Sequence, residues 1–132
     1  RSLDRPPKLQ TNMKFPAISL LIAAYNEEEN ISETIRGIKN QDYPAKIEII
    51  VVDDGSIDNT VSMLHSFNLP NLNIIRSNHG GKARALNEGL QHVTGEIVVC
   101  IDADTFLHPQ ALRRIIARLS SHRPIAPRSP RA

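Results

Sequence analysis

Four short apolar runs alternate along the chain with segments in which apolar residues recur at helical spacing. The runs occupy residues 18–23, 47–52, 72–76 and 96–102. Their shortness and near-continuous hydrophobicity are typical of strands buried on both faces of a parallel sheet. The alternation predicts an α/β fold with a mostly parallel sheet of about four strands and helices on both faces. The expected helical core stripes are Ile31, Ile35 and Ile38; Val61, Leu64 and Phe67; Leu86, Leu90 and Val93; and Leu112, Ile115, Ile116 and Leu119.

Residues 16–119 carry this whole pattern and form one predicted domain. Residues 1–15 are polar and contain Pro6-Pro7, so we expect a linker or disordered lead-in. Residues 120–132 hold three prolines and several basic side chains without periodicity, which predicts a disordered tail. A length of 132 residues allows a single core but not two domains.

Polar clusters follow all four strand-forming runs. They are Tyr25-Asn26-Glu27, Asp53-Asp54-Gly55, residues 78–82 and Asp102-Ala103-Asp104. Parallel strands end at the same edge of a sheet, and ligands bind outside that edge. We therefore expect the clusters to converge on one site.

The two carboxylates of the last cluster are a candidate metal site. Residues i and i+2 of an extended segment point to the same side, so Asp102 and Asp104 repel each other unless a positive charge lies between them. Such oxygen ligands suit Mg²⁺ or Mn²⁺ better than Zn²⁺, and substrate phosphates commonly complete the shell. Alternatively, the two aspartates only end a strand and start a turn. The second acidic strand end, at residues 53–54, favours the metal site.

The Asp53-Asp54-Gly55 cluster has two interpretations of its own. A tight turn needs a glycine with positive φ and an aspartate bonded to the local backbone. A ligand site needs an aspartate that accepts a hydrogen bond from a ribose hydroxyl or a base N–H. We expect one of the two aspartates to be structural and the other to face the ligand.

Two further features are candidates for nucleotide binding. The stretch NHGGKARALN, residues 78–87, places two glycines and Lys82 at a predicted helix start, which favours a phosphate; alternatively, the lysine is only solvated. The ring of Tyr25 either stacks on a nucleobase or packs as a partly buried side chain. Neither a Walker P-loop nor G-x-G-x-x-G occurs in the sequence.

Composition excludes several other classes of function. The formal net charge is only +2 and no basic stripe recurs at helical spacing, so we expect no nucleic-acid partner. Cys100 is the single cysteine, which excludes an intrachain disulfide, and we expect it to pack as a small apolar residue. The five histidines lack metal-ligand spacing. No apolar run approaches the ~20 residues of a membrane span.

Four stretches together resemble the nucleotide-binding N-terminal half of a family 2 glycosyltransferase with the GT-A fold. They are ISLLIAAYNEEENISETIRGIKNQDYP, EIIVVDDGSIDNT, NHGGKARALNEGL and GEIVVCIDADTFLHPQAL, and the likeness spans about residues 16–119. The stretches YPAKIEIIVVDDGS and GGKARALN are most similar to processive synthases of poly-N-acetylglucosamine, chitin oligomers or hyaluronan. The resemblance implies a Rossmann-like GT-A half-domain that binds a UDP-sugar donor for inverting transfer to a sugar or polysaccharide acceptor.

The resemblance also implies roles for individual residues. Tyr25 would stack on the uracil, Asp53 would bond the base or ribose, and Lys82 would lie near the ribose and phosphates. Asp102 and Asp104 would form the D-x-D motif, with Asp104 bound to the Mg²⁺ or Mn²⁺ that bridges the diphosphate. The complete predicted nucleotide-sugar-binding set is Tyr25, Glu27, Asp53, Asp54, Lys82 and Asp102.

Several family features have no counterpart in this sequence. The carboxylate base that deprotonates the acceptor, the Q-x-x-R-W motif and the membrane helices of the synthases belong to the family's second half. We therefore expect an incomplete domain that binds donor without transferring the sugar. The resemblance implies a parent in the inner or plasma membrane with a cytoplasmic catalytic domain, and we expect this chain itself to be soluble and cytoplasmic.

Two alternative functions remain open from the sequence. One is a haloacid-dehalogenase-like phosphatase, whose D-x-D-x-[TV] motif residues 102–106 match imperfectly. The other is an inactive nucleotide-binding fragment.

Overall fold

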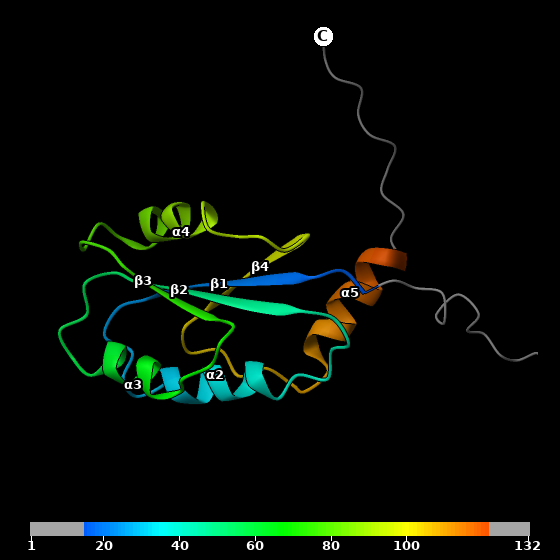
Figure 1. The fold of residues 1–132 in the computed structure, drawn as a ribbon, viewed down its shortest axis with the longest axis horizontal. Coiled ribbons are helices and arrows are strands. Elements are labelled where there is room, and N and C mark those ends of the chain that lie inside the picture. Colours follow the sequence, from blue (N-terminus) through cyan, green and yellow to red (C-terminus); the bar gives the residue numbers. More distant parts are fainter. Residues whose placement is uncertain (1–14, 122–132) are drawn as a thin grey trace, which may run out of the picture.

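Four parallel strands form the centre of the molecule, in the spatial order β3-β2-β1-β4 (Figure 1). The computed structural model describes residues 15–121 of the chain. All three strand pairings are parallel, as the sequence predicts. The strands are β1 (Ile18–Ala24), β2 (Ile47–Asp53), β3 (Leu72–Arg76) and β4 (Ile97–Asp102).

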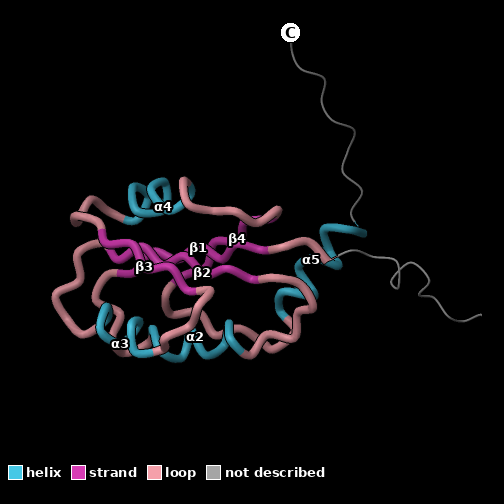
Figure 2. The backbone as a smooth tube through the Cα atoms, in the orientation of Figure 1, coloured by secondary structure: helices cyan, strands magenta, loops and turns pink. Residues whose placement is uncertain are grey.

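Helices cover both faces of the sheet, so that the fold has three layers (Figure 2). On one face lies α4 (Lys82–Leu90). The opposite face is covered by α2 (Ile31–Lys39), α3 (Thr60–Ser66) and α5 (Ala111–Ser121). The predicted arrangement of helices on both faces is confirmed.

The hydrophobic core is divided unequally between the two faces. The larger part packs between the sheet and three helices, and Leu64, Leu112 and Ile116 contribute to it from α3 and α5. The smaller part consists of Leu21, Ile50, Val52 and Ala85 beneath α4. Because β1 and β2 have helices on both sides, their continuous apolar runs are buried, as expected for central parallel strands.

The edge strand β4 differs from the sequence prediction. Its residues alternate between half-buried and exposed, and Val98 and Cys100 are on the exposed face. The reason is that α4 packs against β1 and β2, and no other described element covers that face of β4. The expectations that this run is buried on both faces and that Cys100 packs as a small apolar residue are therefore wrong.

Small residues on α4 bring this helix close to the sheet. Its buried positions are Ala85 and Gly89, whereas Leu90, which we expected in the core, is 45% exposed. A Cβ on Gly89 would overlap Leu21 and lie 2.9 Å from Cγ2 of Val52. The helix therefore packs on the sheet through its smallest side chains. The expected core stripe, which consisted of large apolar residues, did not include them.

The two ends of the described region extend into segments for which we expected no structure. Phe15 packs edge-on against Tyr43, with ring centroids 5.5 Å apart, and the guanidinium of Arg113 lies over its ring. Helix α5 continues to Ser121, although Leu119 in its last turn is 54% exposed and not in the core as expected. The rest of the expected lead-in and tail lies outside the described residues. No helix between residues 15 and 121 has the length and hydrophobicity to cross a membrane.

Candidate functional site

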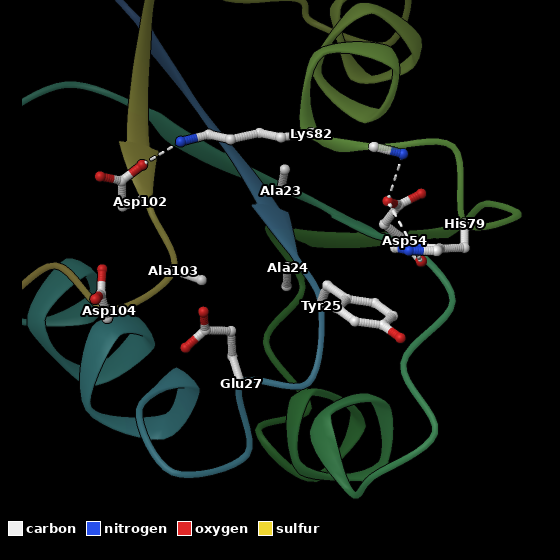
Figure 3. Close-up of a pocket in the computed structure, with 11 residues that line it drawn as sticks. Ala23, Ala24, Tyr25, Glu27, Asp54, His79, Lys82, Asp102, Ala103 and Asp104 are labelled. Atoms are coloured by element: carbon white, nitrogen blue, oxygen red, sulfur yellow. Dashed lines mark hydrogen bonds and ion pairs between the residues drawn. The ribbon is translucent and has the colours of Figure 1, made fainter.

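A pocket of about 430 Å³ lies at the carboxyl ends of the strands (Figure 3). It contains six of the seven predicted site residues, and only Asp53 does not line it. The loops that follow all four strands therefore converge, as the strand order requires. The lining residues are Ala23, Ala24, Tyr25, Glu27, Asp54, His79, Gly81, Lys82, Asp102, Ala103 and Asp104.

The turn after β4 presents two carboxylates on either side of an anchored residue. Ala103 is 4% exposed, and its carbonyl oxygen accepts a 2.6 Å hydrogen bond from Oγ1 of Thr34 on α2. The N–H of Thr105 closes the turn by donating to the carbonyl of Asp102 at 3.0 Å. Because β4 ends at Asp102, Asp104 lies in the turn and not in the strand. Both carboxylates are nevertheless exposed and line the same pocket.

An ion pair crosses the pocket from the start of α4 to the end of β4. Lys82 extends over Ala23, and its Nζ lies 2.6 Å from Oδ1 of Asp102 (Figure 3). The hydrogen bond and charge of Asp102, with a smaller contribution from Asp104, raise the pKa of Lys82. Both side chains are more than 60% exposed, so water screens the pair and it is easily opened.

Asp54 holds the loop between β3 and α4 in place. It is 3% exposed, and its two carboxylate oxygens accept hydrogen bonds from the backbone N–H groups of Gly80 at 3.0 Å and Gly81 at 2.9 Å. Burial by itself raises the pKa of Asp54, but these hydrogen bonds and the nearby His79 outweigh it, so the pKa lies below the ordinary value. Its contacts are those of a structural aspartate.

Asp53 is also fully buried, but its hydrogen bonding is incomplete. Its Oδ2 accepts from the N–H of Ser56 at 3.1 Å and lies 3.5 Å from Nε of Arg76. Its Oδ1 has no hydrogen-bond partner among the described residues. A buried carboxylate oxygen without a partner is energetically costly. The positive φ predicted for Gly55 is confirmed at +91°.

An aromatic stack that the sequence analysis missed forms one wall of the pocket. The rings of Tyr25 and His79 have centroids 4.3 Å apart and planes inclined by 22°. From the sequence we consider His79 only as a metal ligand. Its contact with Tyr25 could not be predicted, because the two residues are far apart along the chain. Its position inside NHGGK, directly after a strand, was the available signal.

Hydrogen bonds between the loops after β1 and β2 hold Tyr25 and Glu27 in position. Asn26 has a φ of +51°; its N–H donates to Oγ of Ser56 at 2.7 Å, and its Oδ1 accepts from the N–H of Ile57 at 2.9 Å. The N–H of Glu27 donates to Oγ1 of Thr60 at 2.8 Å. Both site residues therefore project from a backbone that is fixed on each side.

The acidic residues of the pocket could supply some, but not all, of the ligands of a hard divalent cation. Among residues 15–121, no three His, Cys, Asp or Glu side chains are grouped as a ready-made metal cage. Asp102 and Asp104 supply carboxylate oxygens, and Mg²⁺ is commonly bound by one or two carboxylates together with substrate phosphates and water. The residues present therefore fit a metal that binds together with a phosphorylated ligand.

Comparison with known proteins identifies the family. Residues 19–131 match the profile described as Glycosyl transferase family 2. The chain is 41% identical over 100 residues to the poly-beta-1,6-N-acetyl-D-glucosamine synthase of Staphylococcus epidermidis, covering 71% of this chain and 23% of that protein. It is 34% identical over 112 residues to the synthase of the same name from Staphylococcus aureus, covering 83% and 27%. The chain thus spans about a quarter of the length of these relatives.

Solved structures agree on the fold. The S. aureus TarS 1-349 complex with UDP superposes with a TM-score of 0.73 at 30% identity, over 80% of this chain and 32% of that one. The mannosyltransferase PcManGT from Pyrobaculum calidifontis, in complex with GDP-Man and Mn²⁺, gives 0.72 at 32% identity, over 89% and 38%. The predicted GT-A-like architecture is confirmed, and the phosphatase alternative is set aside. The chain belongs to glycosyl transferase family 2.

Proposed function

We propose that the pocket binds the UDP-sugar donor of a glycosyltransferase through a divalent metal ion. The observation that carries this proposal is the meeting of Asp102, Asp104, Lys82 and Tyr25 around one pocket in a family 2 domain. These residues bring acidic, cationic and aromatic groups together, which are the chemistries needed for a metal, a diphosphate and a nucleobase. The UDP complex of one structural neighbour and the GDP-Man and Mn²⁺ complex of another support the same class of ligand.

The nucleoside would lie near the loops after β1 and β2. Tyr25 is 42% exposed, which leaves its ring accessible to a base. Asp53 is fully buried and does not line the pocket, so in this proposal its unpartnered Oδ1 accepts a base N–H or a ribose hydroxyl only after the loop after β2 moves. Glu27 lines the pocket and receives a 3.3 Å hydrogen bond from Nδ2 of Asn30, which orients it. Asp54 contributes by holding the loop that carries Lys82 and not by direct contact.

The diphosphate would lie between α4 and the turn after β4. In this proposal Lys82 contacts the phosphates, and Asp104 together with Asp102 holds Mg²⁺ or Mn²⁺. A divalent ion bound there would neutralise the negative charge of the departing nucleoside diphosphate. The anchored Ala103 fixes the backbone that carries both carboxylates, which reduces the cost of ordering the turn on binding.

The proposed role in the parent reaction is inverting transfer of a hexosyl or N-acetylhexosaminyl group in polysaccharide synthesis, as in the synthases named above. We assign no catalytic base among the described residues, and we propose that the isolated chain binds donor without transferring sugar. In a membrane-bound parent, this domain would lie on the cytoplasmic side.

Thermal unfolding with different nucleotides tests the proposed function. UDP and UDP-N-acetylglucosamine with Mn²⁺ should raise the unfolding temperature, because a ligand that binds only the folded state stabilises it. ADP with Mn²⁺ is the matched control for a diphosphate without the pyrimidine and should give a smaller shift. Equal shifts with UDP and ADP would contradict a UDP site. Sugar transfer by the isolated chain would contradict the proposal that it binds donor without transferring the sugar.

A further inference from the structure

Lys82 is paired with Asp102, which is also one of the two proposed metal ligands. Its ammonium group is 2.6 Å from Oδ1 of Asp102, one of the two carboxylates assigned to the cation. The neighbouring Asp104 also acts electrostatically on Lys82. A positive charge of the protein itself therefore offsets the repulsion between the two carboxylates.

We propose that Lys82 and the divalent cation compete for Asp102, and that the diphosphate of the donor ends this competition by drawing Lys82 away. The donor and the metal then bind cooperatively, and the lysine links them. This inference rests on the proposed function, because it assumes that the phosphates of the donor enter this pocket.

The competition follows from the geometry of the pair. The ammonium group of Lys82 and a metal ion on the same carboxylate share one negative charge, so Asp102 attracts a metal ion less strongly while Lys82 is bound to it. The positive charge of the Lys82 ammonium group also repels a divalent cation bound to the same carboxylate. Both effects weaken metal binding by the nucleotide-free protein and leave the folded structure unchanged.

The exposure of the pair makes the exchange inexpensive. The side chains of Lys82 and Asp102 are 63% and 64% exposed, so little desolvation was needed to form the pair and little stability is lost when it opens. Lysine carries its charge on a flexible stem, which permits the ammonium to change partners without movement of α4. A diphosphate offers more negative charge than one carboxylate and can therefore compete for the ammonium.

The inference is tested by measuring Mn²⁺ binding with and without UDP. Free Mn²⁺ is followed by electron paramagnetic resonance for the wild-type chain, Lys82→Met, Lys82→Arg and Arg84→Met. Arg84 is the matched control, because it is an exposed cation of the same helix whose side chain lies against Gly80. Without UDP, Lys82→Met should bind Mn²⁺ about three- to tenfold more tightly than the wild type. Lys82→Arg and Arg84→Met should stay within about twofold of the wild type.

Saturating UDP should remove this advantage of Lys82→Met. The factor by which UDP strengthens Mn²⁺ binding should then be smaller in Lys82→Met than in the wild type. By reciprocity, Mn²⁺ should strengthen UDP binding by the same reduced factor. The loss of the advantage in saturating UDP separates a lysine that moves to the donor from one that only repels the metal, and the reciprocal measurement checks that the two coupling factors agree.

Each contrary result has a distinct meaning. If Lys82→Met binds Mn²⁺ no more tightly than Arg84→Met, or if its advantage persists unchanged with UDP, the inference is refuted while donor binding stands. If the wild-type chain binds no UDP, the proposed function fails and the inference fails with it.

Discussion

The imidazole of His79 lies flat against the ring of Tyr25, with ring centroids 4.3 Å apart. Nδ1 of the same imidazole is 3.3 Å from Oδ2 of Asp54, and a Cβ on Gly55 would lie 3.2 Å from Cβ of His79. The stack is thus formed by residues from the loops after β1 and β3, and residues of the loop after β2 contact His79. The orientation of Tyr25 in the pocket depends on all three loops.

Removal of the His79 ring should weaken nucleotide binding. In His79→Ala, Tyr25 loses its neighbour and must be ordered by the ligand, so the Kd of UDP with Mn²⁺ should rise about two- to tenfold, as expected for an aromatic pair worth roughly 0.5–1.5 kcal/mol. Isothermal titration calorimetry measures the change. His79→Phe keeps a ring at this position and should bind UDP more tightly than His79→Ala. Equal affinities of these two variants would show that stacking is not the relevant contact.

Substitution of Asp104 should abolish the dependence of donor binding on metal. Asp104→Asn keeps the shape of the side chain but removes its charge, so the additional thermal stabilisation by UDP in Mn²⁺ over UDP in chelator should disappear. Glu33→Gln is the control, since this carboxylate lies on α2, is exposed and pairs with Arg36. A metal-dependent shift that survives in Asp104→Asn would place the cation elsewhere.

Two glycine-to-alanine substitutions should change stability in opposite directions. Gly89→Ala places a methyl group onto Leu21 and Val52, and such overpacking should lower the free energy of unfolding by about 1–3 kcal/mol. Gly37→Ala on α2 meets its nearest atom, the backbone nitrogen of Leu107, at an ordinary 3.7 Å, and should gain roughly 0.5–1 kcal/mol. Urea denaturation measures both values. Stabilisation by Gly89→Ala would contradict the close packing of α4 on the sheet.

Acid should destabilise the protein partly through Asp54. Because its pKa in the folded state is lowered, its contribution is fully present above its unfolded pKa near 4 and is lost as the pH falls through the folded value. Asp54→Asn should lose about 1–3 kcal/mol at neutral pH, since one of two backbone donors loses its acceptor. Its unfolding free energy should then fall less steeply below pH 4. The dependence should persist in part, because the pKa values of Glu48 and Asp58 are also lowered. An unchanged slope in Asp54→Asn would contradict the role of this carboxylate.

The sheet and the location of the site were predictable from the sequence, for physical reasons. Short apolar runs bounded by polar turns predict buried parallel strands, and the carboxyl ends of parallel strands lie at one edge of the sheet. The convergence of Tyr25, Lys82 and Asp102 in one pocket follows from that geometry.

The remaining features depend on contacts between distant segments. Val98 belongs to an apolar run, but its exposure depends on whether a helix covers the edge strand. Asp54 and Asp53 make different contacts. Asp54 accepts a hydrogen bond from Gly80 in the loop after β3, whereas Asp53 accepts one from Ser56 in the loop after β2. His79 is adjacent to Tyr25 only in the folded chain. Local sequence patterns carry none of this information.

Chemical-shift mapping by NMR tests the central claim most directly, because it locates the ligand on the chain. A second pocket, of about 350 Å³ and lined in part by Lys46, Thr94 and Gly95, lies away from the carboxyl-end site and serves as the internal comparison. Addition of UDP and Mg²⁺ should shift the backbone amides of Tyr25, Gly81, Lys82 and Asp104 and leave Thr94 and Gly95 unchanged. Shifts confined to the second pocket, or no shifts at all, would contradict donor binding at the carboxyl ends of the strands.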